Sequence, residues 1–218
     1  MEGKKATVIE AKEILGKDFI GPEELALIYT KLGIINPLSI YLNFPEIPYS
    51  ISLLNEKKGD YILLLTVPLD AQNEALTLNY LRSFLGWDSI VKEPSFYNQD
   101  WYLKEAFANE CTIELKWSLI KKEIENKTRA KSGQECITEF HYTLPSALLC
   151  SYVFFAYYFH TDGDILWKHD FIWCSDKDHN GDQIYVGKYI DIDGVNKNGF
   201  SIHRHLALRS CYGAVEVL

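Results

Sequence analysis

The spacing of hydrophobic positions predicts helices in the first part of the chain. Between residues 21 and 33, apolar side chains recur every three or four positions, which is the period of one helix face. Pro22 is typical of a first helical turn, and Gly33 is typical of the position just after a helix. Thr77 is a favoured N-cap residue, and it precedes a second helical pattern that ends at Gly86. We therefore expect two short amphipathic helices here.

Two segments in the first part have strand patterns instead. Residues 61–67 form a continuous apolar run that is bounded by turn residues, which indicates a strand buried on both faces. Residues 113–119 alternate between apolar and polar side chains, which is typical of a strand with one face in the core and one in water.

The second part combines one apolar helix with further strands. Residues 145–159 carry no charge, are too few for a membrane span, and are hydrophobic on every side, so they predict a central buried helix. Three strand-like runs follow at 165–174, 183–190 and 200–208, and their short turn-rich connections favour an antiparallel meander. The expected fold class is α+β, with one mostly antiparallel sheet, a C-terminal three-stranded meander and the buried helix. One domain is expected, with a sub-boundary conceivable only at 132–142.

Composition narrows the classes of function. The formal net charge of −8 argues against a broad nucleic-acid-binding surface, because such a surface needs a basic face. Five cysteines without a C-x-x-C pair do not fit a zinc framework or a secreted disulfide scaffold. The first residues contain no apolar stretch that would serve as a signal peptide. The sequence therefore predicts a cytoplasmic protein that is not associated with a membrane.

Aspartates concentrate toward the C-terminal end. Eight of the thirteen aspartates lie between positions 162 and 193. The loop over 176–182 matches the first half of a calcium loop of the EF-hand type, in which Asp176, Asp178 and Asn180 offer side-chain oxygens. Asp182 would add its backbone carbonyl, but Gly187 stands where a bidentate glutamate should close the site. The alternative is a hairpin turn whose Asp and Asn side chains accept bonds from their own backbone.

Histidines suggest a second metal site. Four of the six histidines lie between positions 169 and 205. On a strand over 200–208, His203 and His205 share one face, where two imidazoles can bind one zinc or iron ion. A carboxylate from Asp191 or Asp193 could complete this site for a transition metal. The alternative is that both histidines form the wetter face of a sheet edge.

A set of residues in the second half is similar to a family of uncharacterised bacterial proteins. The set consists of Trp117-Ser118-Leu119-Ile120-Lys121-Lys122, Leu144-Pro145, Leu166-Trp167, Cys174 and Ile184-Tyr185-Val186-Gly187. The resemblance covers about residues 112–212, and its motifs are packing residues. The family is a domain of unknown function, so the resemblance implies one structural unit and no mechanism.

The sequence contains no nucleophile elbow, phosphate-cradling glycine loop or Rossmann fingerprint. These observations favour a non-catalytic cytoplasmic protein that binds a protein partner or associates with itself. No cofactor is expected, unless the Asp-rich loop binds calcium. The competing hypothesis is a metal-dependent hydrolase or a calcium-stabilised module that uses the Asp- and His-rich region. Whether the protein is an enzyme stays open at this point.

Overall fold

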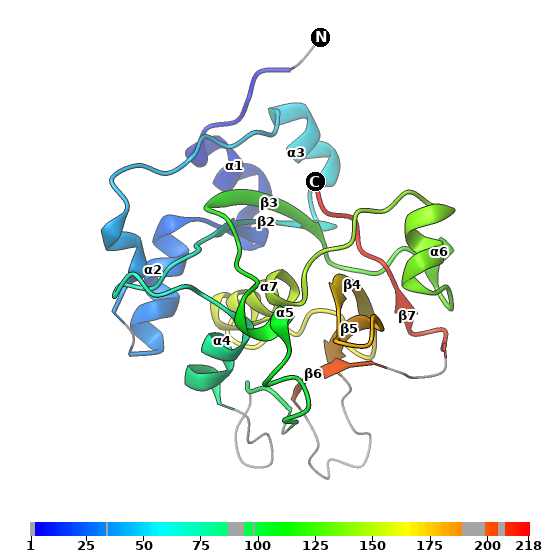
Figure 1. The fold of residues 1–218 in the computed structure, drawn as a ribbon. Coiled ribbons are helices and arrows are strands. Elements are labelled where there is room, and N and C mark those ends of the chain that lie inside the picture. Colours follow the sequence, from blue (N-terminus) through cyan, green and yellow to red (C-terminus); the bar gives the residue numbers. More distant parts are fainter. Residues whose placement is uncertain (1–2, 34, 87–93, 98, 189–198, 205–207) are drawn as a thin grey trace.

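The computed structural model describes residues 3–33, 35–86, 94–97, 99–188, 199–204 and 208–218 (Figure 1). The helices are α1 (Val8–Leu15), α2 (Pro22–Lys31), α3 (Ile51–Lys57), α4 (Leu78–Leu85), α5 (Ala106–Asn109), α6 (Gly133–Thr138) and α7 (Ala147–His160). Short 3-10 helices cover Gly16–Asp18, Pro37–Ile40 and Asn126–Thr128. The strands are β1 (Phe19–Ile20), β2 (Tyr61–Thr66), β3 (Lys116–Lys121), β4 (Phe171–Lys177), β5 (Gln183–Lys188), β6 (Phe200–His203) and β7 (Tyr212–Gly213).

The first sheet has the order β1-β2-β3. The pairing of β1 with β2 is parallel, whereas that of β2 with β3 is antiparallel. All six residues of β2 are buried, as the continuous apolar run predicted. A central strand has partners on both edges and packing on both faces, so every one of its side chains is apolar or hydrogen-bonded.

The second sheet has the order β6-β5-β4-β7. Neighbours among β4, β5 and β6 are antiparallel, but β7 lies parallel to β4. The α+β class is confirmed, whereas the expected single, mostly antiparallel sheet with a three-stranded C-terminal meander is wrong. The strands form two mixed sheets, because β1 and β7 add parallel pairings. Each of these strands is two residues long, which is too short to leave a period in the sequence.

Helix α7 packs against strands of both sheets, and eleven of its fourteen residues are buried. This confirms the predicted central helix. The side chain of Ser146 caps it by accepting a hydrogen bond from the N–H of Leu149. In the part of the chain that the structure describes, no helix is long and apolar enough to cross a lipid bilayer.

Local geometry explains where predicted and observed elements differ. The helices predicted after Pro22 and Thr77 are α2 and α4, and the hydroxyl of Thr77 accepts from the N–H of Tyr80. The strand expected from residue 165 begins only at Phe171. Trp167 and His169 have φ angles of 48° and 66°, and a left-handed backbone cannot continue a strand.

Candidate functional site: an apolar pocket between α2, α4 and α7

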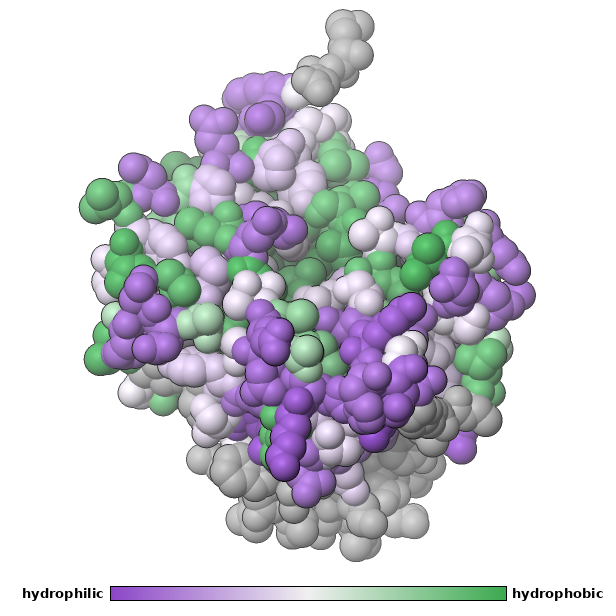
Figure 2. Space-filling model, in the orientation of Figure 1, coloured by the Kyte–Doolittle hydropathy of each residue, from purple (hydrophilic) through white to green (hydrophobic). Residues whose placement is uncertain are grey.

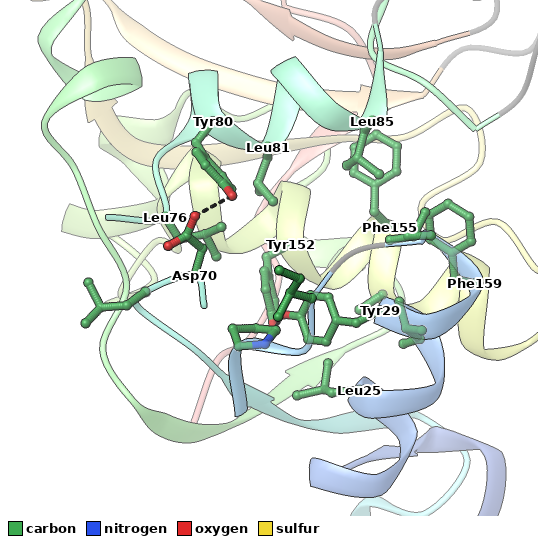
Figure 3. Close-up of a pocket in the computed structure, with 16 residues that line it drawn as sticks. Leu25, Tyr29, Asp70, Leu76, Tyr80, Leu81, Leu85, Tyr152, Phe155 and Phe159 are labelled. Atoms are coloured by element: carbon green, nitrogen blue, oxygen red, sulfur yellow. Dashed lines mark hydrogen bonds between the residues drawn. The ribbon is translucent and has the colours of Figure 1, made fainter. Parts of the chain in front are cut away.

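An apolar pocket lies where α2, α4 and α7 meet the loop that follows β2 (Figure 3). Its cavity volume is about 50 Å³. The lining residues are Leu25, Ile28, Tyr29, Leu32, Ile35, Pro37, Leu69, Asp70, Leu76, Tyr80, Leu81, Leu85, Tyr152, Phe155, Ala156 and Phe159. A cavity of this size holds a few carbon atoms, whereas the usual sites for cofactors and metabolites measure roughly 300–1,000 Å³.

The lining side chains are brought together by helical periodicity. On α7, Tyr152, Phe155 and Phe159 are three or four residues apart, so they share one face and point into the pocket (Figure 3). Leu25 and Tyr29 lie on the matching face of α2. The face of α2 follows from its sequence, because apolar residues at this spacing predict a buried stripe, whereas α7 is hydrophobic on every side and its sequence singles out no face.

One carboxylate, that of Asp70, lies in the pocket wall and is fully engaged. Its Oδ1 accepts from the backbone N–H groups of Gln72 and Glu74 at 2.9 and 2.8 Å. Its Oδ2 accepts from the hydroxyl of Tyr80 at 2.6 Å (Figure 3). Burial raises the pKa of Asp70, but these three hydrogen bonds outweigh it, and the pKa falls below its ordinary value. Asp70 therefore stays ionised and holds the turn after β2 in place.

Two tyrosines supply the other polar atoms at the base of the pocket. The hydroxyls of Tyr29 and Tyr152 are 3.1 Å apart and hydrogen-bonded to each other. Burial raises the pKa of Tyr29 to about 12, and it raises the pKa of Tyr152 as well, so both phenols are neutral at physiological pH. With these pairs made, the pocket offers a ligand mainly hydrocarbon and aromatic ring.

Exposed apolar residues lie on α2 and in the segment that follows it, and one of them lines the pocket. Ile35 lines the pocket and is 65% exposed. Leu27 on α2 is 64% exposed, and Leu42 is 97% exposed. Figure 2 shows hydrophobic residues at the left edge of the molecule, where Figure 1 places α2 and the segment that follows it. Large apolar residues grouped on a surface are typical of binding sites.

The predicted calcium ligands have other partners in the structure. The Oδ2 of Asp176 accepts from the N–H of Ala147 at 2.6 Å, at the start of α7, and burial raises the pKa of this carboxyl. The Oδ1 of Asp178 accepts from the N–H groups of Asn180 and Asp182, both at 2.9 Å. This is the geometry of the alternative interpretation, a turn in which the carboxylate accepts bonds from its own backbone.

The same turn is fixed to distant elements by a charged cluster. The Oδ2 of Asp178 accepts from Arg204 at 2.5 Å, and the guanidinium of Arg204 lies 4.4 Å from the ring centroid of Trp101. Buried Glu105 binds His179 twice, at the backbone N–H and at Nδ1, at 2.9 and 2.6 Å. Sequence reasoning missed Glu105 and Arg204, because no local spacing connects them with the turn.

Only His203 of the predicted transition-metal site lies in the described part of the chain. Asp191, Asp193 and His205 fall outside the described residues. The imidazole of His203 lies against the rings of Phe171 and Tyr185, and burial lowers its pKa to about 4. Among the described residues, no three His, Cys, Asp or Glu side chains are grouped so that they could hold a metal ion.

Sequence reasoning also missed the pocket itself. Each of its helical residues has the pattern of an ordinary core residue, and a pattern does not reveal an unfilled volume. The one signal that could have indicated a surface site is the presence of apolar residues in the segment after Gly33, several of which the structure shows to be exposed.

Comparisons of the chain with protein-family models, with curated proteins and with solved structures find no match. The similarity to uncharacterised bacterial proteins therefore stays a prediction.

Proposed function

We propose that this is a non-catalytic binding protein that holds a hydrophobic side chain of a protein partner in the pocket between α2, α4 and α7. The observation that carries this proposal is the combination of an apolar pocket with an exposed apolar residue, Ile35, in its lining. Protein interfaces concentrate their binding energy in this way, with one anchoring side chain in a pocket and less critical contacts around it.

The size of the pocket supports a side chain as the ligand. A volume of about 50 Å³ accommodates the end of one Leu, Ile or Phe side chain and excludes a nucleotide or a flavin. Burial of such a side chain contributes about 1.5–3 kcal/mol, which corresponds to a factor of roughly ten to one hundred and fifty in affinity. One anchor of this strength is enough to make a hot spot.

The polar groups of the pocket support binding over catalysis. Asp70 accepts three hydrogen bonds, and Tyr29 and Tyr152 bond to each other. A general acid or base must reach a substrate atom with a lone pair or proton that it can exchange. In this pocket the carboxylate and these two phenols use those atoms to hold the walls in position.

The test is selection of peptides from a random displayed library, followed by affinity measurement with labelled synthetic peptides. We expect the selected peptides to share one large hydrophobic residue. Ile35→Asp places a charge at the mouth of the pocket and should weaken binding about tenfold or more. Ala156→Leu fills the pocket from α7 and should have the same effect, with circular dichroism and a thermal melt to check the fold.

Ile9→Asp is the matched control. Ile9 is 71% exposed on α1 and does not line the pocket, so this substitution adds the same charge at similar exposure. Failure to select any hydrophobic peptide, or equal weakening by Ile9→Asp and Ile35→Asp, would contradict the proposal.

A further inference from the structure

The segment that ends at Leu218 joins the two sheets. It leaves the second sheet after β7 and pairs with β3 of the first sheet in antiparallel register, with Val217 opposite Ile120. Leu119 and Leu218 exchange two backbone hydrogen bonds, at 3.3 and 3.0 Å, and the N–H of Lys121 donates to Glu216 at 3.0 Å. At this end, β3 therefore has partners on both edges.

Trp117 presents the next open backbone position on the same edge of β3. Backbone groups alternate in direction along a strand, so those of Trp117 point away from β2, as those of Leu119 and Lys121 do. The carbonyl of Trp117 has only a long contact of 3.4 Å with the hydroxyl of Tyr49. Its N–H has no acceptor among the residues that the structure describes. Backbone N–H groups of folded proteins are nearly always hydrogen-bonded, so this one is open to a partner that reaches the edge of β3.

A groove runs along this edge, with a cavity volume of about 680 Å³. One wall is β3 with the residues just before it, and the other is the segment 143–146. That second wall is attached to the other sheet, because the N–H of Ser175 in β4 donates to the carbonyl of Pro145 at 2.9 Å. Figure 2 shows the molecule hollowed on this side, with hydrophobic residues in the hollow.

We propose that this groove binds an extended segment of a partner protein, which adds to β3 as an antiparallel strand in line with the segment 216–218. The register follows from the ladder. After Leu119 and Leu218, the next hydrogen-bonded pair is centred on Trp117, two residues further along β3. A partner residue there accepts from the N–H of Trp117 and donates to its carbonyl in place of the Tyr49 hydroxyl.

The chemistry of the groove selects this kind of occupant. An open N–H and a weakly bonded carbonyl on one strand edge fit the backbone of an extended chain, which presents the complementary pair every second residue. Leu149 and Val217 line the groove beside polar Thr143 and Ser146. Side chains of an added strand alternate between two faces, so the partner segment should alternate apolar with polar residues. This site is separate from the pocket between α2, α4 and α7, and the two proposals can fail independently.

The test is hydrogen exchange of the full-length protein with the peptide acetyl-Thr-Val-Lys-Val-Thr-amide as the probe. When nine-tenths of the protein carries peptide, exchange of the Trp117 amide should slow roughly tenfold, since only the free tenth stays open. The same peptide methylated on its central backbone nitrogens cannot complete the ladder and should give no slowing. Unchanged exchange at Trp117 over the full peptide titration would overturn the proposal.

Two variants of the protein locate the bound peptide. Thr143→Trp places a large ring in the groove and should abolish the protection of Trp117. Thr138→Trp makes the same change at another exposed threonine, on α6 and outside the groove, and should leave the protection intact. Protection that survives Thr143→Trp would show that the peptide binds elsewhere and would refute the assigned site.

Discussion

Acidification should destabilise the fold through His203. Its imidazole lies nearly parallel to the ring of Tyr185, with centroids 5.5 Å apart, and 5.4 Å from the ring centroid of Phe171. Burial lowers its pKa from the ordinary value of 6.5 to about 4. The folded protein therefore keeps this ring neutral at pH values where the unfolded chain would protonate it.

The direction and size of the effect follow from proton linkage. Above pH 6.5 the imidazole of His203 is neutral in both states, and its contribution to stability is fully present. As the pH falls from 6.5 toward 4, the unfolded state binds a proton that the folded state does not, so the free energy of unfolding decreases. Each pH unit corresponds to about 1.36 kcal/mol. Between pH 6.5 and the pH 4.5 of the assay, two units, the free energy of unfolding therefore falls by about 2.7 kcal/mol. Allowing for the partial exposure of the ring reduces this to about 2 kcal/mol.

Urea unfolding of the wild-type protein and of His203→Phe, at pH 7.5 and pH 4.5, measures this effect. Phenylalanine keeps an aromatic ring beside Phe171 and Tyr185 but binds no proton. The difference in free energy of unfolding, variant minus wild type, should be about 2 kcal/mol larger at pH 4.5 than at pH 7.5. Other titrating groups, such as His160 and Asp176, are present in both proteins, so their contributions cancel in the comparison. The same pH dependence in both proteins would refute the reasoning.

Two further predictions concern the helix cap and the Asp-rich loop. Ser146→Ala removes the hydroxyl that accepts from the N–H of Leu149 at 3.1 Å, and it should cost about 1 kcal/mol in urea unfolding, whereas Ser39→Ala at an exposed position should cost less than about 0.5 kcal/mol. Calcium should not raise the melting temperature, because Asp178 already accepts from Arg204 and from two N–H groups of its own turn. A calcium site would add about 2.7 kcal/mol to the free energy of unfolding when calcium is at one hundred times its dissociation constant. A calcium-dependent rise in melting temperature that Asp178→Asn removes would contradict this interpretation.

The parts of the fold that the sequence predicts are those set by local chemistry. Thr77 caps α4 by accepting from the N–H of Tyr80, three residues along, and Pro22 has the fixed φ that suits a first helical turn, so both signals are visible in the chain itself. The parallel strands β1 and β7 were not predictable, because two residues have no period and their partners lie far along the chain. The left-handed backbone at Trp167 was also hidden, since nothing in a tryptophan side chain favours positive φ.

The candidate sites divide in the same way. Asp178 was identified as a turn or metal residue from its neighbours at 180 and 182, and its bonds to them are local. Its partner Arg204 and the buried Glu105 come from other parts of the chain, and only the fold brings these side chains together. The pocket and the groove are volumes between elements, and the spacing of residues within one element carries no information about them.

The pairing of the segment 212–218 with both sheets also affects how the protein folds. The hydroxyl of Tyr61 donates to the carboxylate of Glu216, 155 residues away, and that of Tyr49 donates to the carbonyl of Leu218, 169 residues away. Contacts between such distant positions slow folding, because most of the chain must be ordered before they form. Until then the whole outer edge of β3 is unpaired, and an unpaired strand edge readily joins that of another molecule. The folding chain therefore passes through a stage that is prone to aggregate, and this stage ends when the segment pairs with β3.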